Sequence, residues 1–190
     1  KSSGKQGFEL AKSLSKKGFE TTLISGPTNL NIGSDINLIQ VETADEMFKA
    51  TQISLPVDVA VLSAAVGDFK VKKFKNEKLK KKDNISLNLE KNIDILNYIS
   101  NHNSLRPKLV IGFSAETNDL NENSMKKLIT KNCDWIIAND VSDKSIGFDS
   151  DFNEVKIFYK SKKINDEKLY KKKKSEISDE IIDRVIEQLN

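Results

Sequence analysis

Three short, almost unbroken apolar runs constrain the fold of this chain more than any other feature. They read "VDVAVLSAAV" at 57–66, "KLVIGFSAE" at 108–116 and "DWIIAND" at 134–140. Continuous apolar runs of this length are typical of parallel strands that are buried on both faces. Segments with helical spacing occur between such runs, and this alternation predicts a parallel sheet with helices on both sides.

The rest of the chain continues the alternation. Helices are expected at 7–17, 43–50, 92–100, 121–131 and 175–189, and strands at 19–25, 36–42, 85–90 and 153–160, the last at the edge of the sheet. Thr43 and Glu46 have the spacing of a capping box, and Gly18 follows the first helix as expected for a C-terminal glycine. The predicted fold class is α/β, a Rossmann-like, doubly wound and mostly parallel sheet formed by a single domain over residues 1–190.

Two lysine-rich segments interrupt this pattern. The segment at about 69–84, "FKVKKFKNEKLKKKDN", follows a buried strand without a tight turn, and a long basic excursion of this kind is typical of a flexible flap or binding loop. The second, "YKKKKS" at 170–175, is interpreted as a solvated linker.

Composition excludes several classes of protein. The net charge of +3 is too small to indicate nucleic-acid binding, and no apolar run approaches the roughly 20 residues of a membrane span. Cys133 is the only cysteine, which excludes a disulfide framework and favours a cytoplasmic protein. His102 is the only histidine and is interpreted as a loop residue.

The first residues, "KSSGKQG", predict a glycine-rich turn into a helix. Backbone N–H groups at such a turn, from Ser3 and Gly4 to Gly7, can bind a phosphate. The run lacks the spacing of a phosphate loop. Since the chain begins with Lys1, we expect its natural start, including a strand ahead of this turn, to be missing.

Ligands of open α/β sheets bind beyond the carboxyl ends of the strands, and three segments here reach that edge. The small residues and carboxylates that follow the apolar runs suit a nucleotide with a metal ion. On the neighbouring helix, Lys127 and Lys131 lie one turn apart on the same face. Two cations at this spacing either are solvated separately or share an anionic ligand such as a triphosphate.

Eight blocks in order resemble phosphopantothenoylcysteine synthetase, the ligase of coenzyme A biosynthesis. They are "SSGKQG", "TLISGPTNL", "AAVGDF", "EKLKK", "KNIDIL", "GFSAETN", "ANDVS" and "GFDSDFNEV". In many bacteria this ligase is the C-terminal half of a bifunctional flavoprotein. The resemblance implies that CTP activates the carboxylate of phosphopantothenate as an acyl-cytidylate, and that L-cysteine then forms the amide and releases CMP. It also implies Mg²⁺, a homodimer, and FMN only where a decarboxylase domain precedes the ligase.

The resemblance assigns roles to individual residues. Lys78 matches the first lysine of the family's flexible loop and is the expected catalytic residue. Asp68 is expected near the ribose, the base or the metal ion, and Asn139 near the acyl substrate. The remaining nucleotide-binding residues are expected to be Ser3, Gly4, Gly7, Ala65, Asn92, Ile93, Asp94, Ile95, Phe113, Lys127 and Lys131. Ile93 and Gly67 depart from the family's proline and alanine at these positions.

Two other functions stay open from the residues alone. The first is an NAD(P)-binding oxidoreductase domain on a similar sheet, although Glu42 is a poor ribose ligand. The second is a nucleic-acid binder that uses the lysine runs, which contain few interleaved aromatic residues. Neither matches the eight blocks, and no nucleic-acid or membrane partner is expected.

Overall fold

A five-stranded mixed sheet forms the centre of the molecule. The computed structural model describes residues 3–72, 86–141 and 150–190. The sheet has the strand order β3-β6-β7-β8-β9. Its strands are β3 (Val59–Leu62), β6 (Leu109–Glu116), β7 (Trp135–Asp140), β8 (Phe152–Tyr159) and β9 (Glu167–Lys173). The first three are parallel, whereas β8 and β9 each run antiparallel to the preceding strand in this order.

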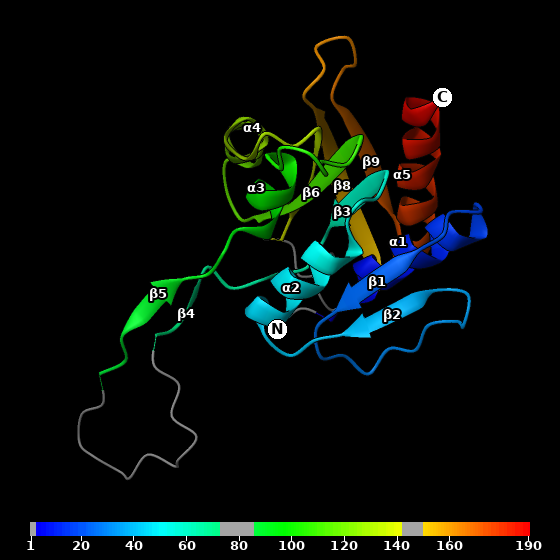
Figure 1. The fold of residues 1–190 in the computed structure, drawn as a ribbon. Helices are drawn as coiled ribbons and strands as arrows, with labels where there is room; N and C mark the ends of the chain where they lie inside the picture. The colour runs from blue at the N-terminus through cyan, green and yellow to red at the C-terminus, as the bar shows by residue number, and fades with distance from the viewer. Residues whose placement is uncertain (1–2, 73–85, 142–149) are drawn as a thin grey trace.

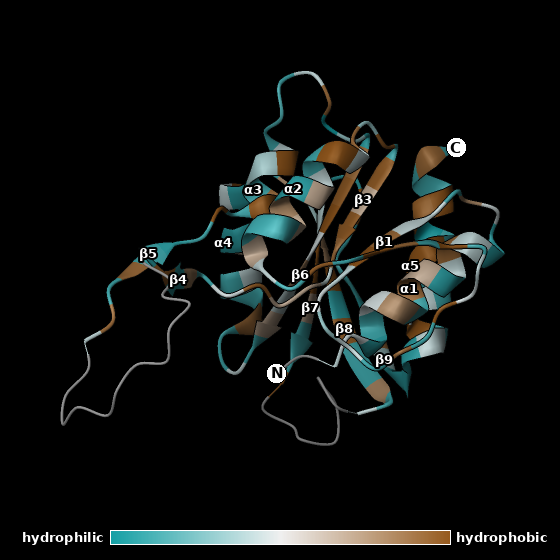
Figure 2. Ribbon diagram, turned by 60° about the horizontal axis from the view of Figure 1, so that its bottom comes forward, coloured by the Kyte–Doolittle hydropathy of each residue, from teal (hydrophilic) through white to brown (hydrophobic). Residues whose placement is uncertain are grey.

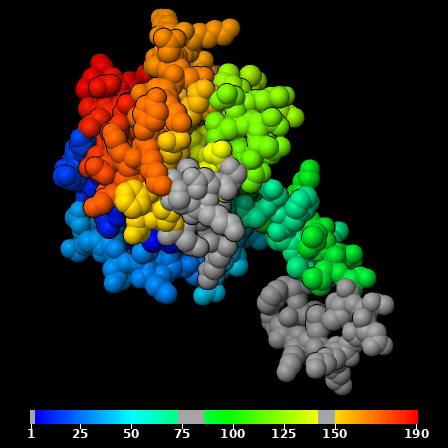
Figure 3. Space-filling model, turned by 180° about the vertical axis from the view of Figure 1, so that it is seen from behind, coloured from blue at the N-terminus to red at the C-terminus, as the bar shows by residue number. Residues whose placement is uncertain are grey.

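Two further strand pairs accompany this sheet. Strands β1 (Thr22–Ser25) and β2 (Asn37–Gln40) form a parallel pair. Strands β4 (Phe69–Val71) and β5 (Leu89–Lys91) form a short antiparallel ribbon. Figures 1 and 3 show this ribbon projecting from the body of the molecule.

Helices cover both faces of the central sheet (Figure 1). The helices are α1 (Lys5–Lys16), α2 (Ala44–Ser54), α3 (Ile95–Ser100), α4 (Leu120–Lys131) and α5 (Lys174–Leu189). Helices α1 and α5 lie against one face, while α3 and α4 lie against the other. The α/β class with a mostly parallel sheet is therefore confirmed.

The alternation of side chains along β6 and β7 explains why both strands are apolar throughout. On β6, Leu109 and Ile111 pack into the cluster that contains α5, whereas Val110 packs toward α3 and α4. On β7, Ile137 and Ile136 alternate in the same way. Figure 2 shows hydrophobic residues along strands of this sheet. Since each face is covered, a polar side chain on either face would lose its contact with water.

Gly112 in the middle of β6 is explained by close helix packing. A Cβ atom at this position would lie 2.6 Å from a methyl group of Leu96 on α3 and 2.9 Å from one of Ile136 on β7. The absence of a side chain lets α3 pack directly on the sheet, and α3 carries part of the candidate site described below.

Local signals placed several elements correctly. The predicted capping box is present at the start of α2, where the Thr43 side chain accepts from the Glu46 N–H and the Glu46 carboxylate accepts from the Thr43 N–H. The helix predicted at 175–189 is α5, and Ile177, Ile181 and Val185 are fully buried. Helix α1 begins at Lys5, two residues before the predicted start.

Two predictions near the C-terminus are wrong. The segment 170–175, interpreted as a solvated linker, contributes four residues to β9 and the first two of α5. Consequently β8, predicted as the edge strand, lies between β7 and β9. Exposed lysine side chains suit an edge strand as well as a linker, because they oppose pairing with another strand. Within the described parts of the chain, no helix is long and apolar enough to cross a membrane.

The single histidine stabilises a loop, and the single cysteine is part of the core. Nδ1 of His102 accepts hydrogen bonds from the backbone N–H groups of Ser104 and Leu105, as expected for a loop residue. Cys133 is fully buried two residues before β7, and burial raises the pKa of its thiol to about 11. A thiol in this state is a poor nucleophile.

Candidate functional site

The two predicted lysines of α4 each contact another predicted residue, one within the second half of β6 and the other at the N-cap of α3. The Lys127 ammonium donates a hydrogen bond to the backbone carbonyl of Phe113 at 2.8 Å. Lys131 forms an ion pair with Asp94. Four predicted nucleotide-binding residues, from β6, α3 and α4, are therefore joined by direct contacts.

Asp94 serves two purposes in this group. It is the N-cap of α3, where its side chain accepts a hydrogen bond from the Asn97 N–H at 2.9 Å. Partial burial by itself would raise the pKa of the Asp94 carboxyl. The hydrogen bonds from Lys131 and Asn97, together with the charges of Lys131 and Lys127, outweigh that effect and lower the pKa. Asp94 is therefore held as a carboxylate.

Lys127 is the more buried of the two lysines. Burial lowers the pKa of its ammonium group, and the nearby charge of Lys131 acts in the same direction. The carboxylates of Glu116 and Asp94 oppose this effect and favour the charged form. The charge of Lys127 therefore depends on its acidic neighbours.

A pocket of about 380 Å³ lies on the outer side of this group. Its lining residues are Glu116, Asn123, Lys126, Lys127, Thr130 and Lys131. Three lysines and one carboxylate give it a positive charge, which suits a polyphosphate. Sequence reasoning did not assign Asn123, Lys126 or Thr130, although Asn123 precedes Lys127 by one helical turn and so shares its face.

A second group joins the segment after β3 to the segment before α3. The Asn92 N–H donates to the carbonyl of Asp68 at 2.9 Å, and Nδ2 of Asn92 donates to the carbonyl of Gly67 at 2.7 Å. The Oδ1 atom of Asn92 is buried and has no hydrogen-bond partner among the described residues. Of the two isoleucines predicted with it, Ile93 is about half exposed, whereas the side chain of Ile95 is buried in the core. Any contact of Ile95 with a ligand would therefore involve its backbone.

A third group places the start of α1 beside the end of β3. A Cβ atom on Gly7 would lie 3.0 Å from Oγ of Ser63, which follows β3 directly. Gly4 is the N-cap of α1 and has a φ of 78°, a left-handed conformation that favours glycine. A Cβ atom on Gly4 would lie 3.2 Å from a methyl group of Thr28. Ser3, just before this turn, is half-buried.

The other predicted residues occupy the same edge of the sheet or lie outside the described residues. Ala65 is exposed three residues after β3, and Asn139 is half-buried near the end of β7, opposite Ala115 of β6. Within the described parts of the chain, no hydrogen bond joins Asn139 to Lys127 or Lys131. Lys78 and most of the predicted flap lie outside the described residues, so the expected catalytic role of Lys78 stays a prediction.

The surroundings of Asp68 suit only a limited role in holding Mg²⁺. Asp68 is exposed. The described ranges contain no group of three or more histidine, cysteine, aspartate or glutamate side chains that could hold a metal ion. Mg²⁺ in nucleotide sites is often bound by one or two carboxylates together with substrate phosphates and water. Asp68 fits this kind of site, in which the nucleotide would bring most of the ligands.

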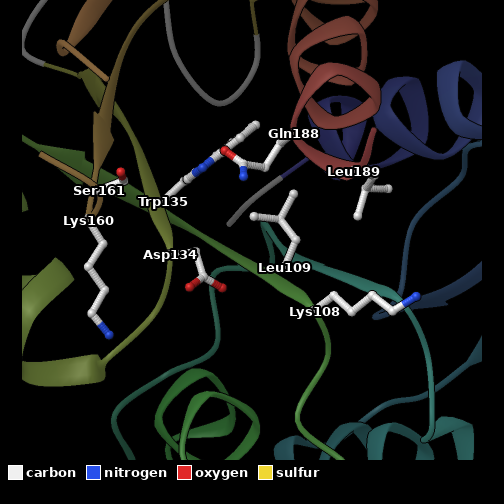
Figure 4. A pocket seen from close by; sticks show the side chains of 8 residues that line it. All are labelled: Lys108, Leu109, Asp134, Trp135, Lys160, Ser161, Gln188 and Leu189. Atoms are coloured by element: carbon white, nitrogen blue, oxygen red, sulfur yellow. The ribbon is translucent and has the colours of Figure 1, made fainter. Parts of the chain in front are cut away.

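Another pocket lies at the opposite end of the sheet. It measures about 500 Å³ and opens beside Leu109 and Trp135, the first residues of β6 and β7 (Figure 4). Its carboxylate, Asp134, is already paired with Arg106 at 3.0 Å. This pocket is far along the strands from the predicted residues, and none of them lines it.

The comparisons with known proteins agree with the resemblance found in the sequence. Residues 1–189 match the family described as "DNA/pantothenate metabolism flavoprotein C-terminal domain". The chain is 36% identical, over 98% of its length, to the coenzyme A biosynthesis bifunctional protein CoaBC of Haemophilus influenzae. It spans 46% of that relative, or about half the length of the curated relatives it matches.

Solved structures show the same fold. The C-terminal domain of a coenzyme A biosynthesis bifunctional protein CoaBC superposes with a TM-score of 0.80 and 32% identity, covering 99% of this chain and 84% of that one. A Cab2 variant in complex with phosphopantothenate-cysteine superposes with a TM-score of 0.75, covering 98% of this chain and 77% of that one; at 16% identity this likeness shows the fold alone. On the match over residues 1–189, the chain belongs to the family of DNA/pantothenate metabolism flavoprotein C-terminal domains.

Proposed function

We propose that the chain is a phosphopantothenate–cysteine ligase that uses CTP. The observation that carries this proposal is the group formed by Lys127, Lys131, Asp94 and Phe113, which places two cations at the carboxyl edge of the sheet. The chain belongs to a family whose full-length members are named for coenzyme A biosynthesis. A protein of the same fold has been obtained with phosphopantothenate-cysteine, the product that this reaction would release.

The first step would be nucleotidyl transfer. A carboxylate oxygen of phosphopantothenate attacks the α-phosphorus of CTP, the bond to the β-phosphate bridging oxygen breaks, and pyrophosphate leaves. Such transfer depends mostly on positioning and on neutralising the charge of the phosphates. We assign Lys127 and Lys131 to the triphosphate and Lys78 to the charge that develops at the α-phosphate. Mg²⁺ would neutralise further phosphate charge, and we assign Asp68 as a candidate protein ligand for it.

The second step would form the amide. The amine of L-cysteine attacks the carbonyl carbon of the acyl-cytidylate, the bond to the CMP oxygen breaks, and the amine loses a proton. We place Asn139 near this carbonyl, because it lies at the carboxyl end of β7 beside β6. Neither step needs a nucleophilic thiol or an imidazole of the enzyme, which agrees with the buried Cys133 and the structural role of His102.

We also propose that the protein acts as a homodimer through the β4–β5 ribbon. Cross-strand partners in a two-stranded ribbon share a face, so Phe69, Val71 and Leu89 lie on the same side. These side chains are 57%, 40% and 58% exposed. Lys70, which lies on the opposite face, is tied to Asp45 of α2 at 2.8 Å. The apolar face is thus left open for a second copy.

The proposed reaction is tested by incubating the protein with CTP, phosphopantothenate and L-cysteine. We expect CMP, pyrophosphate and the amide to form in equal amounts, and omission of any substrate to abolish the amide. Omission of cysteine should leave the first step intact, with pyrophosphate released at most once per site. NADPH binding without CTP binding would instead support an oxidoreductase domain.

We also propose that the protein acts in the cytoplasm. A reaction that requires CTP and free cysteine would take place there, because both substrates are available in that compartment.

Lysine variants test the assignment of the site. Lys127→Met should weaken CTP binding at least tenfold, and Lys78→Gln should reduce turnover strongly without a loss of stability. Lys162→Met is a matched control, because Lys162 is exposed beyond the end of β8, away from the proposed site. Equal effects of Lys127→Met and Lys162→Met would refute the assignment.

A further inference from the structure

A carboxylate in the middle of the lysine pocket needs an explanation. Glu116 lines the same pocket as Lys126, Lys127 and Lys131. A carboxylate at this place repels the phosphates that the lysines would attract. A carboxylate in a phosphate site weakens phosphate binding, so Glu116 needs a structural or electrostatic role that offsets this repulsion.

The hydrogen bonds of Glu116 show what it does in the protein. One carboxylate oxygen accepts from the hydroxyl of Ser114, which is buried two residues earlier on β6. The other accepts from Nδ2 of Asn123 on α4 at 3.2 Å. The same Nδ2 also donates to the backbone carbonyl of Asn118 at 3.2 Å. Glu116 therefore connects the end of β6 with the first half of α4.

This connection fixes the helix turn that carries Lys127. Asn123 and Lys127 are one turn apart on α4, and Lys127 contacts β6 itself through the carbonyl of Phe113 at 2.8 Å. The side chain of Asp119, the N-cap of α4, makes no capping hydrogen bond. The start of α4 is attached by two other side chains: Oδ1 of Asn121 accepts from the Lys156 ammonium of β8 at 3.0 Å, and Asn123 donates to Glu116 at the end of β6.

The negative charge of Glu116 also favours the protonated, charged form of Lys127. The charged and titratable groups that act on Lys127 are Glu116 on β6, Asp94 at the N-cap of α3, Lys131 on α4 and Cys133, two residues before β7. Burial and Lys131 favour the neutral amine, whereas Glu116 is the strongest of the groups that favour the ammonium. Asp94 is already paired with Lys131. Among the described residues, the hydrogen bonds of Glu116 go to Ser114 and Asn123, so its charge is not engaged in an ion pair with another lysine.

A role as a metal ligand explains these contacts less well. Both oxygens of Glu116 already accept hydrogen bonds, and no cluster of three metal-binding side chains occurs in the residues the structure describes. An acidic metal ligand would also need to turn away from Ser114 and Asn123, which would release α4.

We propose that Glu116 is a positioning residue of the nucleotide site, which fixes α4 to the end of β6 through Asn123 and holds Lys127 in place as the ammonium group that meets the triphosphate. This inference rests on the proposed function for the identity of the ligand. The link from Glu116 through Asn123 to α4 rests on the contacts alone, and the influence of Glu116 on Lys127 is one of charge.

The test compares Glu116→Gln with the wild type and with Glu122→Gln. Glu122 is an exposed glutamate in the first turn of the same helix, so its variant removes the same charge without touching the Glu116 contacts. CTP affinity is measured by calorimetry between pH 7 and 10, and circular dichroism checks the fold. We expect Glu116→Gln to weaken CTP binding about tenfold at pH 7.5 and to shift the alkaline loss of binding to lower pH. The loss shifts because Lys127 gives up its proton more easily without Glu116. Glu122→Gln should match the wild type.

A second measurement does not depend on CTP. The side-chain resonances of Lys127 are followed by NMR during a pH titration of the nucleotide-free protein, with Lys127→Met for assignment. In Glu116→Gln, Lys127 should titrate at lower pH than in the wild type. If CTP fails to bind the wild type while this shift is present, the proposed function fails and the placement of Lys127 stands.

Two results would overturn the inference. One is an unchanged Lys127 titration in a folded Glu116→Gln protein. The other is a uniform loss of CTP affinity with no change in its pH dependence, as a purely structural role would give. If Glu116→Gln does not fold, Asn123→Ala is used instead: it leaves the charge of Glu116 in place, and it should weaken CTP binding several-fold with little change in the pH profile. Full CTP affinity in that variant would exclude the connection through Asn123.

Discussion

Asp94 at the start of α3 forms an ion pair with Lys131 in the last turn of α4, and this pair links the two helices on one face of the sheet. The same carboxylate caps α3 through the N–H of Asn97. Asp94 thus combines a helix cap with an interhelical contact. The contributions of the cap and of the ion pair to stability can be measured separately with two substitutions, one that removes both and one that removes only the ion pair.

Asp94→Ala should destabilise the protein by about 1–2 kcal/mol, because it removes an N-cap and an ion pair that is partly exposed. Asp94→Asn should cost less, about 0–1 kcal/mol, since asparagine also serves as an N-cap. Urea unfolding of both variants measures the two free energies. Equal losses would show that the cap contributes nothing beyond the ion pair.

Gly112→Ala should destabilise the protein by about 1–3 kcal/mol or more, because its methyl group would collide with Leu96 and Ile136. Gly26→Ala is the matched control, since a Cβ atom at Gly26 meets nothing within 4 Å. Thermal unfolding of the two variants provides the comparison. A stable Gly112→Ala protein would mean that α3 packs less closely on the sheet than described.

The thiol of Cys133 should react slowly with a disulfide reagent at pH 8 in the native state and quickly in urea. Burial raises its pKa to about 11 from an ordinary value of 9.0. A raised pKa means that the native state favours the protonated thiol. This contribution to stability is complete below about pH 9 and is lost as the pH rises toward 11, by roughly 2–3 kcal/mol at 1.4 kcal/mol per unit.

The variant Cys133→Ala separates this effect from the titration of other groups. Its loss of stability between pH 9 and 11 should be smaller than that of the wild type, as measured by urea unfolding at each pH. A native thiol that reacts within seconds at pH 8 would contradict the burial of Cys133.

Leu89→Glu should convert a dimer into a monomer if the β4–β5 ribbon forms the proposed interface. A charge buried between two copies of an apolar face costs several kcal/mol, whereas the same charge is tolerated on an exposed face. Ile53→Glu is the control, because Ile53 is 82% exposed on α2. Sedimentation equilibrium measures the mass of each variant. A wild type that is monomeric at micromolar concentration would refute the dimer.

Local patterns in the sequence were sufficient for much of the fold. The apolar runs located β3, β6 and β7, the spacing of Ile177, Ile181 and Val185 located α5, and Thr43 with Glu46 located the start of α2. Each of these signals depends on the periodicity or hydrogen bonding of one segment, which is independent of the rest of the molecule.

Strand pairing could not be predicted in the same way. The lysines of 170–175 favoured a linker, yet Leu169 is buried and the segment pairs with β8. Whether an exposed, basic segment joins a sheet is decided by the neighbouring strand that it can pair with. The residues of the segment itself do not show whether such a neighbouring strand exists, so strand propensity alone could not predict the pairing.

The sequence by itself determined that the chain alternates helices and strands, that its family motifs occur in order, and that Lys127 and Lys131 share one face of a helix. Only the tertiary structure decided which residues of different segments meet. It brought Asp94 to Lys131 across 37 positions of the chain and Asn123 to Glu116 across the turn into α4. Spacing along a helix fixes a face because the helix has a constant pitch, but the partner of that face depends on how α3, α4 and β6 pack together.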